Sequence, residues 1–154
     1  MRGAIMAVGV LMLAGCAQSR ACIGLLEKAE ARYYDSLSEA KRTAPEKDDD
    51  KKWKTVLTDF GQVQGYVDES RRRYNALKRE DPDKDAELRS ELEKVNYFQR
   101  LNKIYSCSLK LQGIALHNLG SQVYAEQKMK AGDLAAREAE ERYKYTIDCG
   151  YGGL

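Results

Sequence analysis

The side chains of this chain that could do chemistry are four cysteines and one histidine, set among 24 Asp and Glu residues. His117 has no second histidine and no cysteine pair at ligand spacing, so a zinc site would lack its ligand set. One histidine among many carboxylates also defines no Ser/His/Asp arrangement and no general acid/base pair. The sequence therefore predicts no catalytic residue, no metal ligand and no cofactor. It predicts His117 to be a surface or half-buried side chain.

The first cysteine, Cys16, directly follows a short apolar run at the N-terminus. Arg2 supplies a positive charge, residues 4–13 are apolar, and the small residues Ala14 and Gly15 precede the cysteine. This layout is typical of a secretory signal peptide. The run is shorter than the ~20 residues that a membrane-spanning helix needs. The alternative to any special role for Cys16 is an ordinary secreted protein in which the cysteine stands there by chance.

The sequence Leu13-Ala14-Gly15-Cys16 resembles the lipobox of bacterial lipoproteins. The resemblance implies that the Cys16 thiol takes a diacylglyceryl group, that residues 1–15 are removed, and that the new amine is often acylated. Two or more acyl chains give stable attachment, so the protein would be tethered to a membrane rather than span it. Ala17 replaces the Asp that favours inner-membrane retention in enteric-type bacteria. The resemblance therefore points to the outer membrane, facing the periplasm, with the inner membrane and the cell surface left open.

The remainder of the chain is long enough for one domain with its own core. Without Arg2 it has 25 Lys and Arg residues, which nearly balance the 24 acidic ones and argue against nucleic acid or an anionic membrane surface as partner. The basic runs at 71–73 and 51–52 have acidic neighbours and are expected on solvated helix faces. We divide the chain into a signal peptide (1–15), a short lipidated linker (16–20), a helical bundle domain (21–149) and a C-terminal tail (150–154).

Composition and periodicity predict an all-α fold, because prolines are few and no segment alternates with period two. A first helix is expected over about 21–42, with one apolar stripe: Cys22, Leu26, Ala29, Tyr33, Leu37 and Ala40. Asp48 to Asp50 would begin a second helix, whose coiled-coil-like seam is Trp53, Val56, Phe60, Val63, Val67, Ser70, Tyr74 and Leu77. Gly61 and Gly65 interrupt this helix. They indicate a close approach of another helix or, as the alternative, a ligand-binding notch.

A third helix is expected to begin at Pro82, capped by Asp81, and to continue to about residue 130. From 97 to 124 it is apolar on more than one side, which predicts that its neighbours bury it. Gly113 and Gly120 are the positions at which it could bend or break. A last helix is expected over 134–148. The predicted fold is thus an all-α antiparallel bundle of about four helices, with the third long and central.

Leu116-x2-Leu119-Gly120-x2-Val123, followed by Ala139-x3-Tyr143, is similar to part of the tetratricopeptide pattern. Leu116 stands where the pattern has Trp, Val123 stands where it has an aromatic residue, and no second copy precedes it. The resemblance implies a helical hairpin in the C-terminal third. The alternative is two antiparallel helices that meet through small residues.

Three cysteines remain after lipidation of Cys16, and an odd number in an oxidising compartment suggests one bridge and one free thiol. If the third helix is unbroken, the last helix returns Cys149 to the end of the bundle where Cys22 lies. If the chain instead reverses near Gly113, Cys107 and Cys149 can pair. We expect the unbroken helix, because Gly113 has no proline or polar turn residue beside it, and hence a Cys22–Cys149 bridge.

These features predict a lipid-anchored, periplasm-facing helical protein that binds another envelope protein, as an accessory or assembly factor. The rival hypotheses are an envelope enzyme with a scattered site, marked by a deep pocket that holds carboxylates of raised pKa, and a purely structural spacer.

Overall fold

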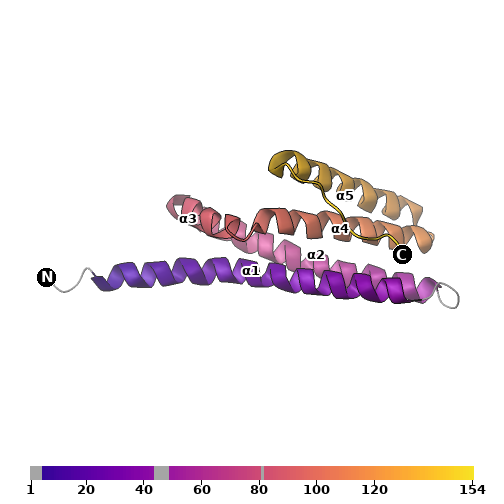
Figure 1. Cartoon of the computed structure of the whole chain (residues 1–154), viewed down its shortest axis with the longest axis horizontal. Helices are drawn as coiled ribbons and strands as arrows, with labels where there is room; N and C mark the ends of the chain where they lie inside the picture. The colour runs from indigo at the N-terminus through magenta and orange to yellow at the C-terminus, as the bar shows by residue number, and fades with distance from the viewer. Residues whose placement is uncertain (1–4, 44–48, 81) are drawn as a thin grey trace.

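The computed structural model describes residues 5–43, 49–80 and 82–154, and for residues 5–16, 49 and 82 it describes only the backbone. All regular structure in these ranges is helical, which confirms the all-α prediction. The described residues form five helices rather than about four: α1 (Ile5–Arg42), α2 (Asp49–Glu80), α3 (Pro82–Glu93), α4 (Tyr97–Asn118) and α5 (Gln122–Tyr143) (Figure 1).

Helices α1 and α2 lie side by side and pack through the two stripes that the sequence predicted (Figure 1). Every member of the first stripe is buried, and the α2 seam is buried from Trp53 to Ser70. The last two seam residues, Tyr74 and Leu77, are half-buried and pack at the edge of the core. Apolar residues at spacings of three and four occupy one helix face, so both stripes could be located from sequence alone.

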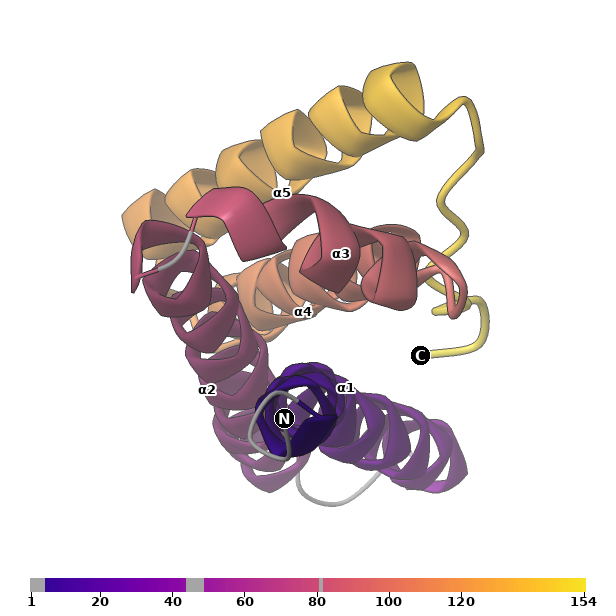
Figure 2. The same ribbon diagram turned by 90° about the vertical axis from the view of Figure 1, so that its left-hand side faces the viewer.

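Helix α4 is the central element of the fold. It packs against each of the other four helices, and Figure 2 shows it between α5 and α1. Half of its 22 residues are buried, as the apolar character of residues 97–124 predicted.

The expected continuous third helix is wrong, because the chain forms three separate helices over 82–143. The first break is at Asn96, which adopts a left-handed conformation with φ of 53°. The second is at Gly120, where φ is 81°. Glycine has no Cβ and adopts this left-handed conformation without steric strain, which allows the chain to turn into α5. Gly113, the other predicted break, lies inside α4. The last helix also ends earlier than expected, at Tyr143, because left-handed Lys144 caps it.

Small residues allow α4 and α5 to approach closely. A Cβ atom on Gly132 would lie 2.9 Å from the Ser106 carbonyl oxygen, and one on Gly113 would lie 2.7 Å from Met129 Cγ. The close approach expected at Gly61 and Gly65 is wrong, since a Cβ atom at either position would meet nothing within 4 Å. Neither glycine belongs to the predicted seam of α2, and the helix face on which they lie is exposed.

The tail after α5 folds back across α4 towards α1 (Figures 1 and 2). The Tyr145 hydroxyl donates to the Gln99 carbonyl oxygen at 2.9 Å, and the Ile147 N–H donates to Glu140 Oε1 at 2.7 Å. The Tyr33 hydroxyl then donates to the Cys149 carbonyl oxygen at 2.6 Å. The tail is therefore held along its length by hydrogen bonds to α1, α4 and α5.

The predicted Cys22–Cys149 bridge is wrong. Cys149 is bonded to Cys107, with Cα atoms 5.3 Å apart, and Cys22 is a buried free thiol. The prediction assumed that Cys149 would end a helix at the same end of the bundle as Cys22. In the structure α5 ends six residues earlier, and the extended tail returns along the molecule to the middle of α4.

The N-terminal predictions fall largely beyond what the structure describes. Residues 1–4 and the side chains of Leu13 to Cys16 lie outside the described part, as do Asp48 and the predicted cap Asp81. Residues 16–20, expected to be a linker, continue α1 as helix. Pro82 begins α3, as predicted.

Candidate functional site

A groove of about 450 Å³ lies where α2, α3, α4 and α5 come together. We call it the basic groove, because four of its residues are cationic and one is acidic. Its lining is Arg71, Tyr74, Asn75 and Lys78 from α2, Arg89 and Glu93 from α3, Tyr97, Phe98, Leu101 and Asn102 from α4, and Arg142 and Tyr143 from α5. Its volume lies in the range of small-ligand sites.

Two arginines of the basic groove are held in place by neighbouring side chains. Arg71 donates to Asn102 Oδ1 at 2.8 Å, and its guanidinium lies 3.9 Å from the centre of the Tyr105 ring. Arg89 pairs with Asp85 at 4.0 Å. A hydrogen bond with Tyr74, together with the nearby Asp85, raises the pKa of Arg89. These contacts orient the guanidinium groups before any ligand arrives.

Lys78 and Arg142 differ from these two arginines. Both are exposed. Neither forms an ion pair with a carboxylate in the part of the chain that the structure describes. Arg142 lies 5.7 Å from the centre of the Tyr143 ring. These two cations are therefore free to meet an anionic ligand without losing an ion pair.

Aromatic rings form one wall of the basic groove. Phe98 and Tyr143 stack with their planes 5° apart and their centres 6.5 Å apart, which joins α4 to α5. Tyr74 and Tyr97 both meet Phe98 edge-on, with ring centres 5.3 and 5.1 Å away. Such contacts contribute about 0.5–1.5 kcal/mol each beyond burial, so this wall is rigid.

A buried polar chain ties the basic groove to the start of the core on α1. The Ser70 hydroxyl donates to the Cys22 carbonyl oxygen at 2.9 Å and lies 2.6 Å from the Tyr97 hydroxyl. Burial raises the pKa of Tyr97 to about 12 and also raises the pKa of the Cys22 thiol. Both groups are therefore neutral at ordinary pH, and Cys22 is poorly suited to nucleophilic chemistry.

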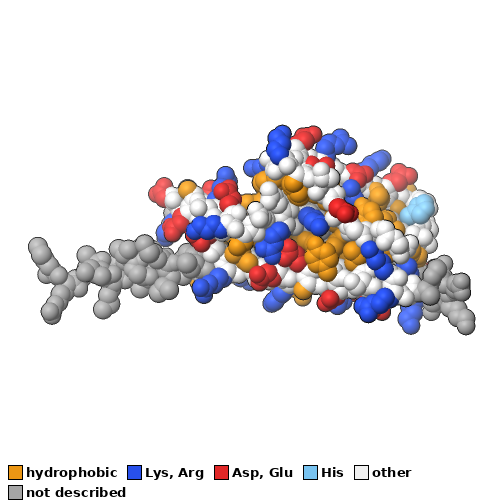
Figure 3. Space-filling view, in the orientation of Figure 1, with side chains coloured by type: hydrophobic (Ala, Val, Ile, Leu, Met, Phe, Trp, Pro, Cys, Tyr) orange, Lys and Arg blue, Asp and Glu red, His pale blue; other side chains and the backbone are white. Residues whose placement is uncertain are grey.

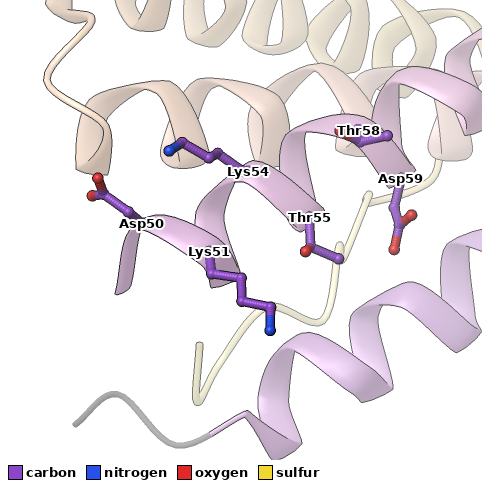
Figure 4. A pocket seen from close by; sticks show the side chains of 6 residues that line it. All are labelled: Asp50, Lys51, Lys54, Thr55, Thr58 and Asp59. Atoms are coloured by element: carbon purple, nitrogen blue, oxygen red, sulfur yellow. The ribbon is translucent and has the colours of Figure 1, made fainter. Parts of the chain in front are cut away.

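A second pocket of about 420 Å³ lies near the start of α2 (Figure 4). All six residues that line it belong to this one helix: Asp50, Lys51, Lys54, Thr55, Thr58 and Asp59. Asp59 is already paired with Arg32 of α1 at 2.6 Å. Polar groups from several elements do not converge here, so this pocket is a weaker candidate than the basic groove.

The described residues contain no group of three His, Cys, Asp or Glu side chains that could hold a metal ion. His117 is exposed, as expected, with Nδ1 2.8 Å from Gln122 Oε1. Burial raises the pKa of the Asp68 carboxyl, yet Asp68 lines neither pocket. Acidic and basic side chains are interspersed over the face shown in Figure 3.

Sequence reasoning missed the residues of the basic groove. Arg71 was assigned with its two neighbours to a solvated face. That holds for Arg72 and Arg73, which pair with Glu69, but Arg71 turns towards α4. The available signal was spacing, since Arg71, Tyr74 and Lys78 recur at intervals of three and four on α2. What spacing could not show is that α3, α4 and α5 complete the groove.

Among the described residues, no helix has both the length and the hydropathy that crossing a membrane requires. The chain matches no protein-family model, no curated protein and no solved structure. Its function must therefore be argued from its own residues.

Proposed function

We propose that this chain is a lipid-anchored helical binding protein that faces the periplasm, attached to the outer membrane through Cys16. In this role it acts as an accessory or assembly factor by binding another envelope protein. The observation that carries the proposal is Leu13-Ala14-Gly15-Cys16 at the end of a short apolar run.

The position of the anchor relative to the basic groove supports this proposal. Cys22 stands six positions after Cys16 on the same helix, an axial rise of about 9 Å. Through Ser70, Cys22 is joined to Tyr97 of the basic groove. A lipid on Cys16 would thus hold the groove near the membrane surface, where it could meet the exposed segments of other envelope proteins.

The Cys107–Cys149 bridge also supports a location outside the cytoplasm. Disulfides form and persist in oxidising compartments, and the bacterial periplasm is one of them. The bridge fixes the tail to α4, so in an oxidising compartment it would stabilise the fold.

A binding role also accounts for the basic groove better than catalysis does. An enzyme of this fold would be indicated by a pocket that holds carboxylates of raised pKa. Asp68, whose pKa burial raises, lines neither pocket. The basic groove instead gathers arginine and aromatic side chains, which are typical of recognition surfaces.

The proposal is tested by Cys16→Ser, expressed in a bacterium that processes lipoproteins. We expect the wild type to incorporate labelled palmitate, to be shortened by its signal peptide and to fractionate with the outer membrane. Cys16→Ser should remain an unprocessed, unlabelled precursor. Cys22→Ser is the matched control, because it removes a cysteine that follows no small-residue motif and should leave labelling unchanged. Normal processing and labelling of Cys16→Ser would falsify the proposal.

A further inference from the structure

The lining of the basic groove carries more positive than negative charge. Four cations line it against one carboxylate, Glu93. Asp85 lies 4.0 Å from Arg89 and Asp68 lies near Arg71, whereas Lys78 and Arg142 have no ion pair among the described residues. Because the chain as a whole is nearly neutral, this local excess favours a ligand that carries negative charge.

The residue types in the groove favour a protein segment over a bilayer surface. Arginine and tyrosine, with tryptophan, are enriched at the energetic centres of protein interfaces, and the groove has three arginines and three tyrosines. Helix α3 beside it is acidic, with Asp83, Asp85, Glu87, Glu91 and Glu93 against Lys84 and Arg89. An anionic membrane pressed against α3 would be repelled, whereas a narrow segment can enter the groove without covering that helix.

The aromatic wall of the groove favours a ligand that also carries an apolar or aromatic side chain. Phe98 and Tyr143 stack on each other, and Arg142 lies 5.7 Å from the Tyr143 ring centre. An apolar or aromatic side chain of the ligand could pack on these rings while neighbouring carboxylates meet Lys78 and Arg142. A pocket of about 450 Å³ has room for only a few side chains.

We propose that the basic groove binds a short acidic segment of another protein, in which carboxylates flank an aromatic or large aliphatic anchor. This inference rests on the proposed binding function and specifies the chemistry of the partner. The carboxylates would meet Lys78, Arg142 and the pre-oriented Arg71. The anchor would pack against Phe98 and Tyr143.

The test is selection of short random displayed peptides on the full-length protein in dodecyl maltoside micelles. The selected peptides are synthesised with a fluorescent label, and their affinity is measured by anisotropy. We expect enrichment of Asp and Glu next to aromatic or large aliphatic residues. The double variant Lys78→Gln/Arg142→Gln should weaken binding about tenfold or more, because it removes two exposed charges of the groove. Neither side chain is part of the buried core.

Lys51→Gln/Lys54→Gln is the matched control, because it removes the same charge from exposed positions at the other end of α2 and should leave affinity unchanged. Selected peptides without an acidic excess would overturn the proposal, as would equal binding to both double variants. Phosphatidylglycerol added to the micelles should not displace the peptide. Displacement would assign the groove to lipid headgroups instead. Palmitate labelling of Cys16 is measured in a separate experiment. The peptide-binding proposal can therefore be contradicted without contradicting the proposed lipid anchor, and the reverse.

Discussion

Cys149, near the end of the chain, attaches the C-terminal tail to the helical core. Its sulfur is bonded to Cys107 in the middle of α4, and its carbonyl oxygen accepts a hydrogen bond from Tyr33 of α1. Burial raises the pKa of the Tyr33 hydroxyl, so this donor keeps its proton throughout the physiological range. One residue thereby connects the tail to two helices that are far from it in sequence.

We predict that Cys107→Ser/Cys149→Ser lowers the free energy of unfolding by about 4 kcal/mol at most. The bridge closes a loop with a sequence separation of 42. In the chain-entropy model, a cross-link that closes a loop of this size restricts the unfolded chain and thereby stabilises the folded protein by about that amount. Urea unfolding of the double variant and the wild type measures the difference. Wild-type protein treated with a reductant should match the double variant.

Peptide mapping under non-reducing conditions provides the check on connectivity. The map should contain one cross-linked pair, Cys107 with Cys149, and Cys22 should react with a thiol reagent only after unfolding, because its side chain is fully buried. A cross-linked peptide that contains Cys22 would contradict both the bridge and the path of the tail.

At the scale of the helices, four glycines separate into two pairs with opposite roles. Gly61 and Gly65 lie on the exposed face of α2 with open space around them. Gly113 and Gly132 lie in the contact between α4 and α5, where added atoms would collide with the facing helix. The same residue type therefore weakens one helix and allows another pair to pack.

We predict that Gly61→Ala and Gly65→Ala each stabilise the protein by about 0.5–1 kcal/mol, because alanine loses less backbone entropy in a helix. Gly132→Ala should instead destabilise it by about 1–3 kcal/mol, since the new Cβ atom would lie 2.9 Å from the backbone oxygen of Ser106. Gly113→Ala should cost less than Gly132→Ala, because the nearest backbone atom to its new Cβ, the Ala125 carbonyl oxygen, is 3.1 Å away rather than 2.9 Å.

Thermal unfolding of the four single variants measures these effects. Equal destabilisation by all four substitutions would show that α2 is also packed closely on its Gly61 face, contrary to the fold described above.

The contrast between these helices explains what sequence could predict. The stripes of α1 and α2 were placed correctly, because each helix buries one continuous face and a three–four period marks it. Gly120 was named as a possible break, but an unbroken helix was expected, and the break at Asn96 was not foreseen. Asn96 and Gly120 both require a positive φ there, and sequence alone does not distinguish such a turn from a glycine or asparagine inside a helix.

The basic groove was missed for a related reason. Periodicity reveals which residues share a face of one helix, but the groove takes residues from four helices. Lys78 and Arg142 are 64 positions apart in the printed sequence and line one groove only because α5 turns back along α4. The path of the tail, and with it the cysteine pairing, depended on the same turns.

For the molecule as a whole, α5 is the helix that depends on the fewest neighbours. Its backbone packs against α4 alone, while α4 also packs against α1, α2 and α3. The outer face of α5 exposes Val123, Tyr124 and Leu134. Only four of its 22 residues are buried, against eleven of the 22 in α4. Segments with few buried residues open at a lower free energy than the core of a domain. We therefore predict that amide hydrogens of α5 exchange earlier than those of α2 and α4.

Hydrogen exchange followed by mass spectrometry of the oxidised full-length protein measures this order, and it also reports on the basic groove. Arg142 and Tyr143 are in the last turn of α5, whereas the other groove residues belong to α2, α3 and α4. A ligand in the groove would contact α5 and also α2, α3 and α4, and so would hold α5 against the rest of the fold. A selected acidic peptide should therefore slow exchange in α5 and leave exchange in α1 unchanged. If α5 is instead protected as strongly as α2 without any peptide, its contact with α4 alone is enough to hold it closed, and the predicted order of exchange is wrong.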